Sequence, residues 1–97
     1  MRKYRLSPLA EFDLDEIWNY IARDDADIAA DFIRKLIERF VLISRQPEIG
    51  RVRDELAPGI RQVQYKDYAI FYTVSEMDVE IARVLHGARD IESQFEM

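Results

Sequence analysis

Cysteine is absent from the 97-residue sequence, and histidine occurs once, as His86. The first absence excludes a disulfide framework and a thiolate metal site, and a single imidazole excludes a metal site built from several histidines. Glycine occurs only three times, and no Gly-rich phosphate loop is present. The serines show no nucleophile elbow or catalytic-triad context. The sequence therefore implies neither a metal ion nor another cofactor.

Long apolar runs are also missing. No segment approaches the ~18 apolar residues that cross a bilayer, and no apolar segment of the signal-peptide kind follows the basic N-terminus. We therefore expect a cytoplasmic protein without membrane contacts. The composition, 48% hydrophobic and 34% charged, is that of a globular protein. A chain of 97 residues can bury one core, so we expect residues 1–97 to form a single domain.

Positive charge is scarce. The net charge is −5, and the only lysines, Lys3, Lys35 and Lys66, are scattered. A dedicated nucleic-acid binder needs a basic surface to neutralise phosphates, so we expect no direct sequence-specific nucleic-acid binding. The acidic excess lies near the two ends, because residues 32–89 hold ten basic and eight acidic side chains. A local basic site in the middle of the chain stays open.

Local patterns predict a short strand and then a helical hairpin. Tyr4–Leu6 is a strand candidate, and Ser7 and Pro8 are typical of an N-cap and a first helical position. Residues 8–22 carry one apolar stripe at helical spacing, formed by Ala10, Leu14, Ile17, Trp18 and Ile21. A second, longer amphipathic helix follows the polar connection 23–27 and continues to Ser44. A short link between two such helices predicts an antiparallel pair.

The side of the first helix opposite that stripe also carries large apolar residues, namely Leu9, Phe12 and Tyr20. Isolated apolar residues are common on protein surfaces and need no explanation. Three on one face also fit a contact surface for a partner. Both interpretations stand at this level.

Three strands are predicted after residues 46–59, which we interpret as an irregular, solvated connector. The strands span Ile60–Tyr65, Tyr68–Val74 and Val79–His86, with connections short enough for hairpin turns. Together with Tyr4–Leu6 they predict a mainly antiparallel sheet. The expected fold class is α+β with the order β-α-α-β-β-β, in which an N-terminal strand and a helical hairpin pack on the sheet.

The last strand contains an arginine in an apolar setting. Period-2 alternation places Arg83 on one face with Val79, Ile81 and Leu85. A guanidinium among apolar side chains must find an anionic or carbonyl partner. One interpretation is an internal ion pair with Asp90 or with a carboxylate at a helix end.

The other interpretation is an anion-contact cluster at the end of that strand. Arg61, Arg83 and Arg89 would form it, and His86 would act as a general acid or base. A single histidine at a strand end is more often hydrogen-bonded to the backbone than catalytic. The residues alone therefore assign no enzyme class.

The whole chain resembles the ParE/RelE toxin superfamily. Residues Tyr4–Glu11 resemble the ParE opening, and Pro47–Arg51 and Leu56–Arg61 resemble its middle loop. Tyr68–Tyr72 and Arg83–Ile91 are similar to its closing hairpin. The likeness is collinear over nearly the whole chain and points to the ParE branch.

The resemblance implies the toxin of a type II toxin–antitoxin pair. Such a toxin inhibits DNA gyrase, is not an enzyme, and is neutralised by a ParD-like antitoxin that lays a helix along its apolar surface. Leu9, Phe12 and Tyr20 are candidate antitoxin contacts. Phe12 departs from the small residue associated with its position in ParE-like openings. Four basic residues are further candidates for partner contact, as a docking terminus: Arg61, Arg83, His86 and Arg89.

Two alternatives stay open. A RelE-like ribosome-dependent mRNA endoribonuclease would use Arg61, Arg83 and His86, together with Tyr68, at an mRNA phosphate. The scarcity of lysine and the acidic balance argue against it. A non-toxic antitoxin-binding module would keep the fold without the toxicity, because a fold does not decide function.

Overall fold

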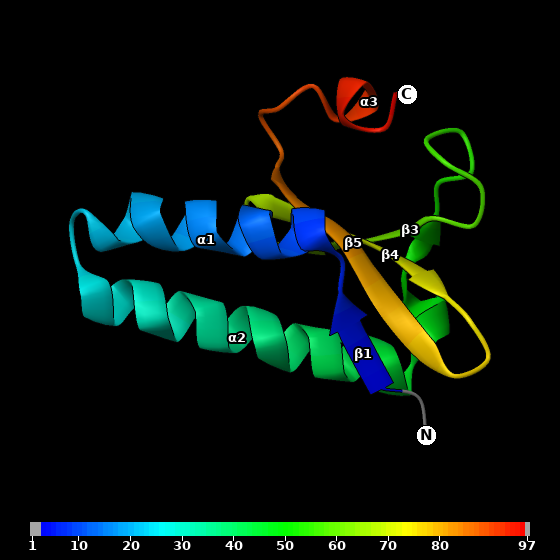
Figure 1. The fold of residues 1–97 in the computed structure, drawn as a ribbon, viewed down its shortest axis with the longest axis horizontal. Helices are drawn as coiled ribbons and strands as arrows, with labels where there is room; N and C mark the ends of the chain where they lie inside the picture. Colours follow the sequence, from blue (N-terminus) through cyan, green and yellow to red (C-terminus); the bar gives the residue numbers. More distant parts are fainter. Residues whose placement is uncertain (1–2, 97) are drawn as a thin grey trace.

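The computed structural model describes residues 3–96 and contains one mixed sheet and a helical hairpin (Figure 1). Its elements are β1 (Lys3–Leu6), α1 (Pro8–Ala22), α2 (Ala26–Arg45), the 3-10 turn η1 (Pro47–Ile49), β2 (Arg51–Val52), β3 (Arg61–Tyr65), β4 (Tyr68–Val74), β5 (Asp78–His86) and α3 (Ile91–Gln94). The strand order is β1-β5-β4-β3-β2. β1 runs parallel to β5, and the other neighbours are antiparallel. The predicted α+β fold is confirmed.

Both long helices begin at a capping side chain. The Ser7 hydroxyl accepts a hydrogen bond from the Ala10 amide at 3.0 Å, and Pro8 follows at the first helical position. At the start of α2, the Asp25 carboxylate accepts from the amides of Asp27 and Ile28. These bonds satisfy backbone N–H groups that have no partner inside a helix. The helix starts are thus set by local sequence.

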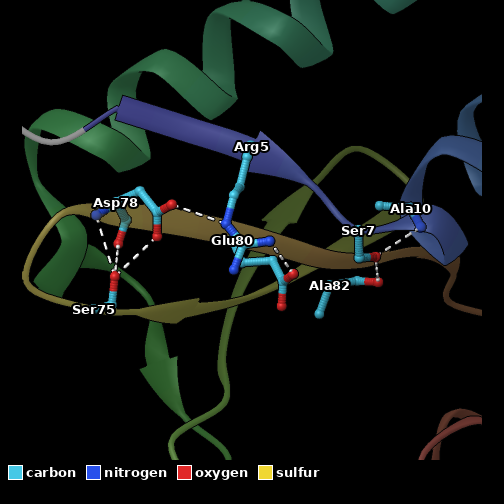
Figure 2. Close-up of polar contacts among 7 residues, drawn as sticks. All are labelled: Arg5, Ser7, Ala10, Ser75, Asp78, Glu80 and Ala82. Carbon is cyan, nitrogen blue, oxygen red and sulfur yellow. Dashed lines mark hydrogen bonds and ion pairs between the residues drawn. The ribbon is translucent and has the colours of Figure 1, made fainter.

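Polar side chains fix β1 to β5 (Figure 2). Arg5 donates to Asp78 at 2.8 Å and to Glu80 at 2.6 Å. Ser7, which caps α1, also donates its hydroxyl hydrogen to the Ala82 carbonyl at 2.8 Å. Ser7 therefore holds the start of α1 against the middle of β5.

Ser7→Ala is expected to lower the free energy of unfolding by about 2 kcal/mol, because it removes a helix cap and a link between two elements. Asp25→Ala is the matched control, since within residues 3–96 the Asp25 side chain accepts hydrogen bonds only from amides of its own helix, α2. We expect about 1 kcal/mol there. Urea unfolding of both variants measures the difference. Equal losses would show that the bond to Ala82 adds nothing.

The main core lies between the helical hairpin and one face of the sheet. Its buried members are Ala10, Ile17, Leu36, Phe40, Ile43, Tyr65, Ile70, Tyr72, Val79, Ile81 and Val84. Trp18, expected in the core stripe of α1, is instead 37% exposed. Asp13 is buried in α1 with Ala10 and Ile17. The buried arc of α1 is thus turned toward Asp13, because α1 packs against the edge of β5 as well as against α2.

A second, smaller core covers part of the other sheet face. Its buried members are Ile60, Ala69, Phe71 and Leu85. Leu56 and Ala57 of the preceding loop pack against it, as do Ile91 and Phe95 near the C-terminus. The segment 46–59, expected as a solvated connector, instead contains η1 and β2 and contributes to this core. Its contacts are tertiary, so local composition did not reveal them.

A β-bulge changes the faces of β5. Tyr72 pairs with Ile81, but the preceding Phe71 pairs with Arg83, so Ala82 is an extra residue. After it, Val84 joins Ile81 in the main core, and Leu85 lies in the second core. The predicted alternation is therefore wrong beyond Ile81. One inserted residue moves each later side chain to the opposite face.

Candidate functional site

Arg83 is held in a buried, bidentate ion pair with Asp13. Its Nε and Nη2 each donate to an Asp13 carboxylate oxygen at 2.9 Å. The same carboxylate accepts the Val84 amide at 2.9 Å, beyond the point where β1 stops pairing with β5. Arg83 is 7% exposed and Asp13 is 5% exposed. The hydrogen bonds to Asp13 raise the pKa of Arg83 above its usual value, against an opposing effect of burial.

The partner of Arg83 is thus neither Asp90 nor a carboxylate at a helix end. Asp13 lies inside α1, more than one turn after the helix begins at Pro8. A signal was present, since Asp13 is three residues after Ala10 and four before Ile17, both buried. A buried charge needs a partner of opposite charge. A carboxylate on the buried arc of a helix is therefore a candidate partner for an arginine on an apolar strand.

Arg61 begins β3 and lies far from His86 along the sheet. Its guanidinium donates to the Gly50 carbonyl at 2.7 Å. Arg61 pairs with Tyr72 and His86 pairs with Tyr68, so the two are separated by roughly 13 Å along the strands. The structure therefore does not bring Arg61, Arg83 and His86 together around one point.

His86 is exposed and is bonded to the local backbone. Its Nδ1 accepts from the Ala88 amide at 3.0 Å, so the neutral ring carries its proton on Nε2. The ring stands edge-on to Tyr68, with centroids 5.2 Å apart. This arrangement is typical of a strand end, and it leaves Nε2 as a donor.

A hollow of about 460 Å³ lies between α1 and the open end of the β4–β5 hairpin, where β4 begins at Tyr68 and β5 ends at His86. We call this place the β4–β5 end. The polar side chains that line it include Glu16, Tyr20, Arg23, Tyr68, His86 and Arg89. Burial raises the pKa of Tyr68, with smaller contributions from Tyr20 and Asp67 and an opposing one from Arg89. The structure thus brings together four residues singled out in the sequence, namely Tyr20, Tyr68, His86 and Arg89.

The outer flank of α1 carries exposed apolar side chains. Leu9 and Phe12 are each 55% exposed, and Tyr20 is 70% exposed. At 100° per residue the three fall within about 80° of one another around the helix axis. We call these three residues the α1 flank. Since Tyr20 also lines the hollow, the flank and the hollow form one continuous surface.

A second apolar surface lies between the two helices. It is a groove of about 550 Å³ lined mainly by Trp18, Ile33, Ile37 and Val41. Trp18, which the sequence placed in the core stripe of the first helix, lines this groove instead. The apolar arc of α2 is wider than one interface with the sheet requires, and that excess width was the available signal.

Within residues 3–96, no group of three or more histidine, aspartate or glutamate side chains is placed to hold a metal ion. Among the helices of the same range, none has the length and apolar character needed to span a bilayer.

Comparison with known proteins gives a consistent family assignment. Residues 4–91 match the model of the family described as "ParE toxin of type II toxin-antitoxin system, parDE". Toxin ParE1 of Mycobacterium tuberculosis is 35% identical over 92 residues, covering 93% of this chain and 94% of the relative. Toxin ParE1 of Caulobacter vibrioides is 39% identical over 87 residues, covering 89% of this chain and 90% of the relative.

The fold has a counterpart among solved structures. A chain of the chromosomal ParDE TA system from P. aeruginosa superposes with a TM-score of 0.75. The superposition covers 89% of this chain and 96% of that chain. At 19% sequence identity the likeness concerns the fold. The match of the family model over almost the entire sequence, together with the two relatives, shows that this chain belongs to the ParE family of type II toxins.

Proposed function

We propose that this chain inhibits DNA gyrase in the cytoplasm and is neutralised by a ParD-like antitoxin. Membership of the ParE family supports the toxin role. The family description names parDE, and the solved counterpart comes from a ParDE system. Both support an antitoxin of the ParD kind as the partner.

The arrangement of the basic residues favours action by binding rather than mRNA cleavage. Arg83 is bound by Asp13, and Arg61 is bound by the backbone of Gly50. A ribonuclease site needs cationic and acid–base groups that converge on one phosphate. With these two arginines engaged and far from a common point, a RelE-like mechanism lacks the charge stabilisation that Arg61 and Arg83 would have supplied.

The observation that carries the antitoxin proposal is the exposure of the α1 flank, made of Leu9, Phe12 and Tyr20. Exposed apolar side chains that share one face of a helix fit a surface that a partner covers. An amphipathic antitoxin helix can bury them in a helix-on-groove contact. The groove beside Trp18 and Ile37 offers a second apolar surface on the same hairpin.

Two assays on the purified protein test the target. We expect inhibition of gyrase-catalysed DNA supercoiling and no cleavage of ribosome-bound mRNA. Cleavage without gyrase inhibition would overturn the proposal in favour of the RelE-like function. Absence of both effects, with the antitoxin still bound, would favour the non-toxic binding module.

Phe12→Ala is expected to weaken binding of the antitoxin by about thirtyfold, the size of an interface hot spot. The probe is the purified product of the small open reading frame that the proposed function predicts beside this gene. Met77→Ala is the matched control, because Met77 is an exposed apolar residue in the turn between β4 and β5. Isothermal titration calorimetry compares the two variants. An unchanged affinity in Phe12→Ala would show that the antitoxin does not contact the α1 flank at Phe12.

A further inference from the structure

We propose that the hollow between α1 and the β4–β5 end is a subsite for an acidic side chain of the antitoxin. The proposal rests on the proposed function and adds the chemistry of one contact to it. The occupant is an aspartate or glutamate on the antitoxin segment that covers the α1 flank.

Two arginines without carboxylate partners line this hollow. Within residues 3–96, neither Arg23 nor Arg89 forms a salt bridge, and both contribute to the lining. Among the described residues, the arginines that do form salt bridges are Arg5, Arg34, Arg53 and Arg83. In a protein of net charge −5, two unpaired guanidinium groups at one hollow indicate a site for an external anion.

The carboxylates of the hollow do not cancel this charge. Asp13 lies at its inner wall, but Arg83 already neutralises it. Glu16 is the other carboxylate of the lining, and it makes no salt bridge within the described part of the chain. Two free cations therefore face one free anion, and the excess is positive.

Hydrogen-bond donors complete the site. His86 keeps Nε2–H available because Nδ1 is bonded to Ala88. A tyrosine hydroxyl is protonated at neutral pH, and burial raises the pKa of Tyr68 further. A carboxylate accepts two parallel bonds from one guanidinium and still has lone pairs for such donors. A single carboxylate of a peptide side chain therefore matches the hollow.

Continuity with the α1 flank identifies the bearer of this carboxylate. Tyr20 belongs to both surfaces, and Leu9 lies about 17 Å farther along the same helix. A helix of roughly three turns laid along α1 would cover Leu9 and Phe12 and reach the hollow at its end. A nucleic acid does not suit this surface, since it would place phosphates against exposed apolar side chains.

The test compares Arg23→Gln/Arg89→Gln with Arg45→Gln/Arg51→Gln. The control arginines are exposed, form no salt bridge within residues 3–96 and do not line the hollow. Binding of the neighbouring gene's product is measured by calorimetry at two salt concentrations, after circular dichroism has shown the same melting temperature for each toxin. We expect the first variant to bind at least about thirtyfold more weakly and with a smaller salt dependence, and the control to change less than about threefold.

A charge exchange identifies the partner residue. Arg89→Glu is combined with single Asp→Lys and Glu→Lys variants of the antitoxin, and we expect one of them to restore binding at least tenfold, a change of about 1.4 kcal/mol. Normal antitoxin affinity in Arg23→Gln/Arg89→Gln overturns the subsite and leaves the proposed function standing. Normal antitoxin affinity with loss of gyrase inhibition also overturns it, and assigns the hollow to the target. Failure of the unmodified toxin to bind the neighbouring product overturns the proposed function itself.

Discussion

Asp13→Ala is expected to lower the free energy of unfolding by about 3–5 kcal/mol. The change leaves the Arg83 guanidinium buried without its carboxylate, and it removes the acceptor of the Val84 amide. A buried charge without a partner costs more than the ion pair itself contributes, because the desolvation cost is no longer offset. Urea unfolding followed by circular dichroism measures the loss.

Two comparisons separate this effect from the simple loss of a charge. Arg34→Ala breaks an exposed pair with Asp31 and Glu38, and should cost less than about 1 kcal/mol. Asp13→Asn/Arg83→Met removes both charges and keeps a side-chain carbonyl for Val84. This double variant should be more stable than Asp13→Ala. A loss below about 1 kcal/mol in Asp13→Ala would contradict a buried pair.

Gly50→Ala is expected to destabilise the fold by about 3 kcal/mol. A Cβ at this position would lie 2.3 Å from the hydroxyl oxygen of Tyr72 and 2.7 Å from its ring. The ring cannot withdraw, because Tyr72 is fully buried and its hydroxyl donates to Pro47 at 2.7 Å and accepts from Gly50 at 2.8 Å. The φ of Gly50 is −77°, so space rather than backbone conformation demands glycine.

Removing the hydroxyl isolates its part in this clash. Tyr72→Phe should itself cost about 2 kcal/mol through two lost hydrogen bonds. The double variant Gly50→Ala/Tyr72→Phe should lose less stability than the two single variants lose in total, because the shortest contact of the new Cβ is gone. Gly87→Ala is the control, because its Cβ would approach only the Asp67 carbonyl, at 3.4 Å. Additive losses in the double variant would show that the hydroxyl is not the obstacle.

Local sequence determined the two long helices, the strands β1, β3, β4 and β5, and their order along the chain. The cap at Ser7, the apolar periodicity of the helices and the runs that form β4 and β5 depend on neighbours within a few residues. The exposure of Leu9, Phe12 and Tyr20 also followed from helix geometry alone. The similarity of the whole chain to ParE toxins added the family, which the physical pattern by itself did not give.

Tertiary structure decided which polar groups meet. Asp13 and Arg83 are 70 residues apart, and their contact requires α1 to take over the edge of β5 where β1 ends. The bulge at Ala82 exchanged the faces of the residues after it, which no alternation rule predicts. The hollow also exists only in the folded chain, where α1 packs beside the start of β4 and the end of β5. Tyr20, His86 and Arg89 line this hollow, and Arg61 does not. Strand periodicity and helix caps are properties of adjacent residues, whereas register, edge contacts and hollows arise only when distant segments pack.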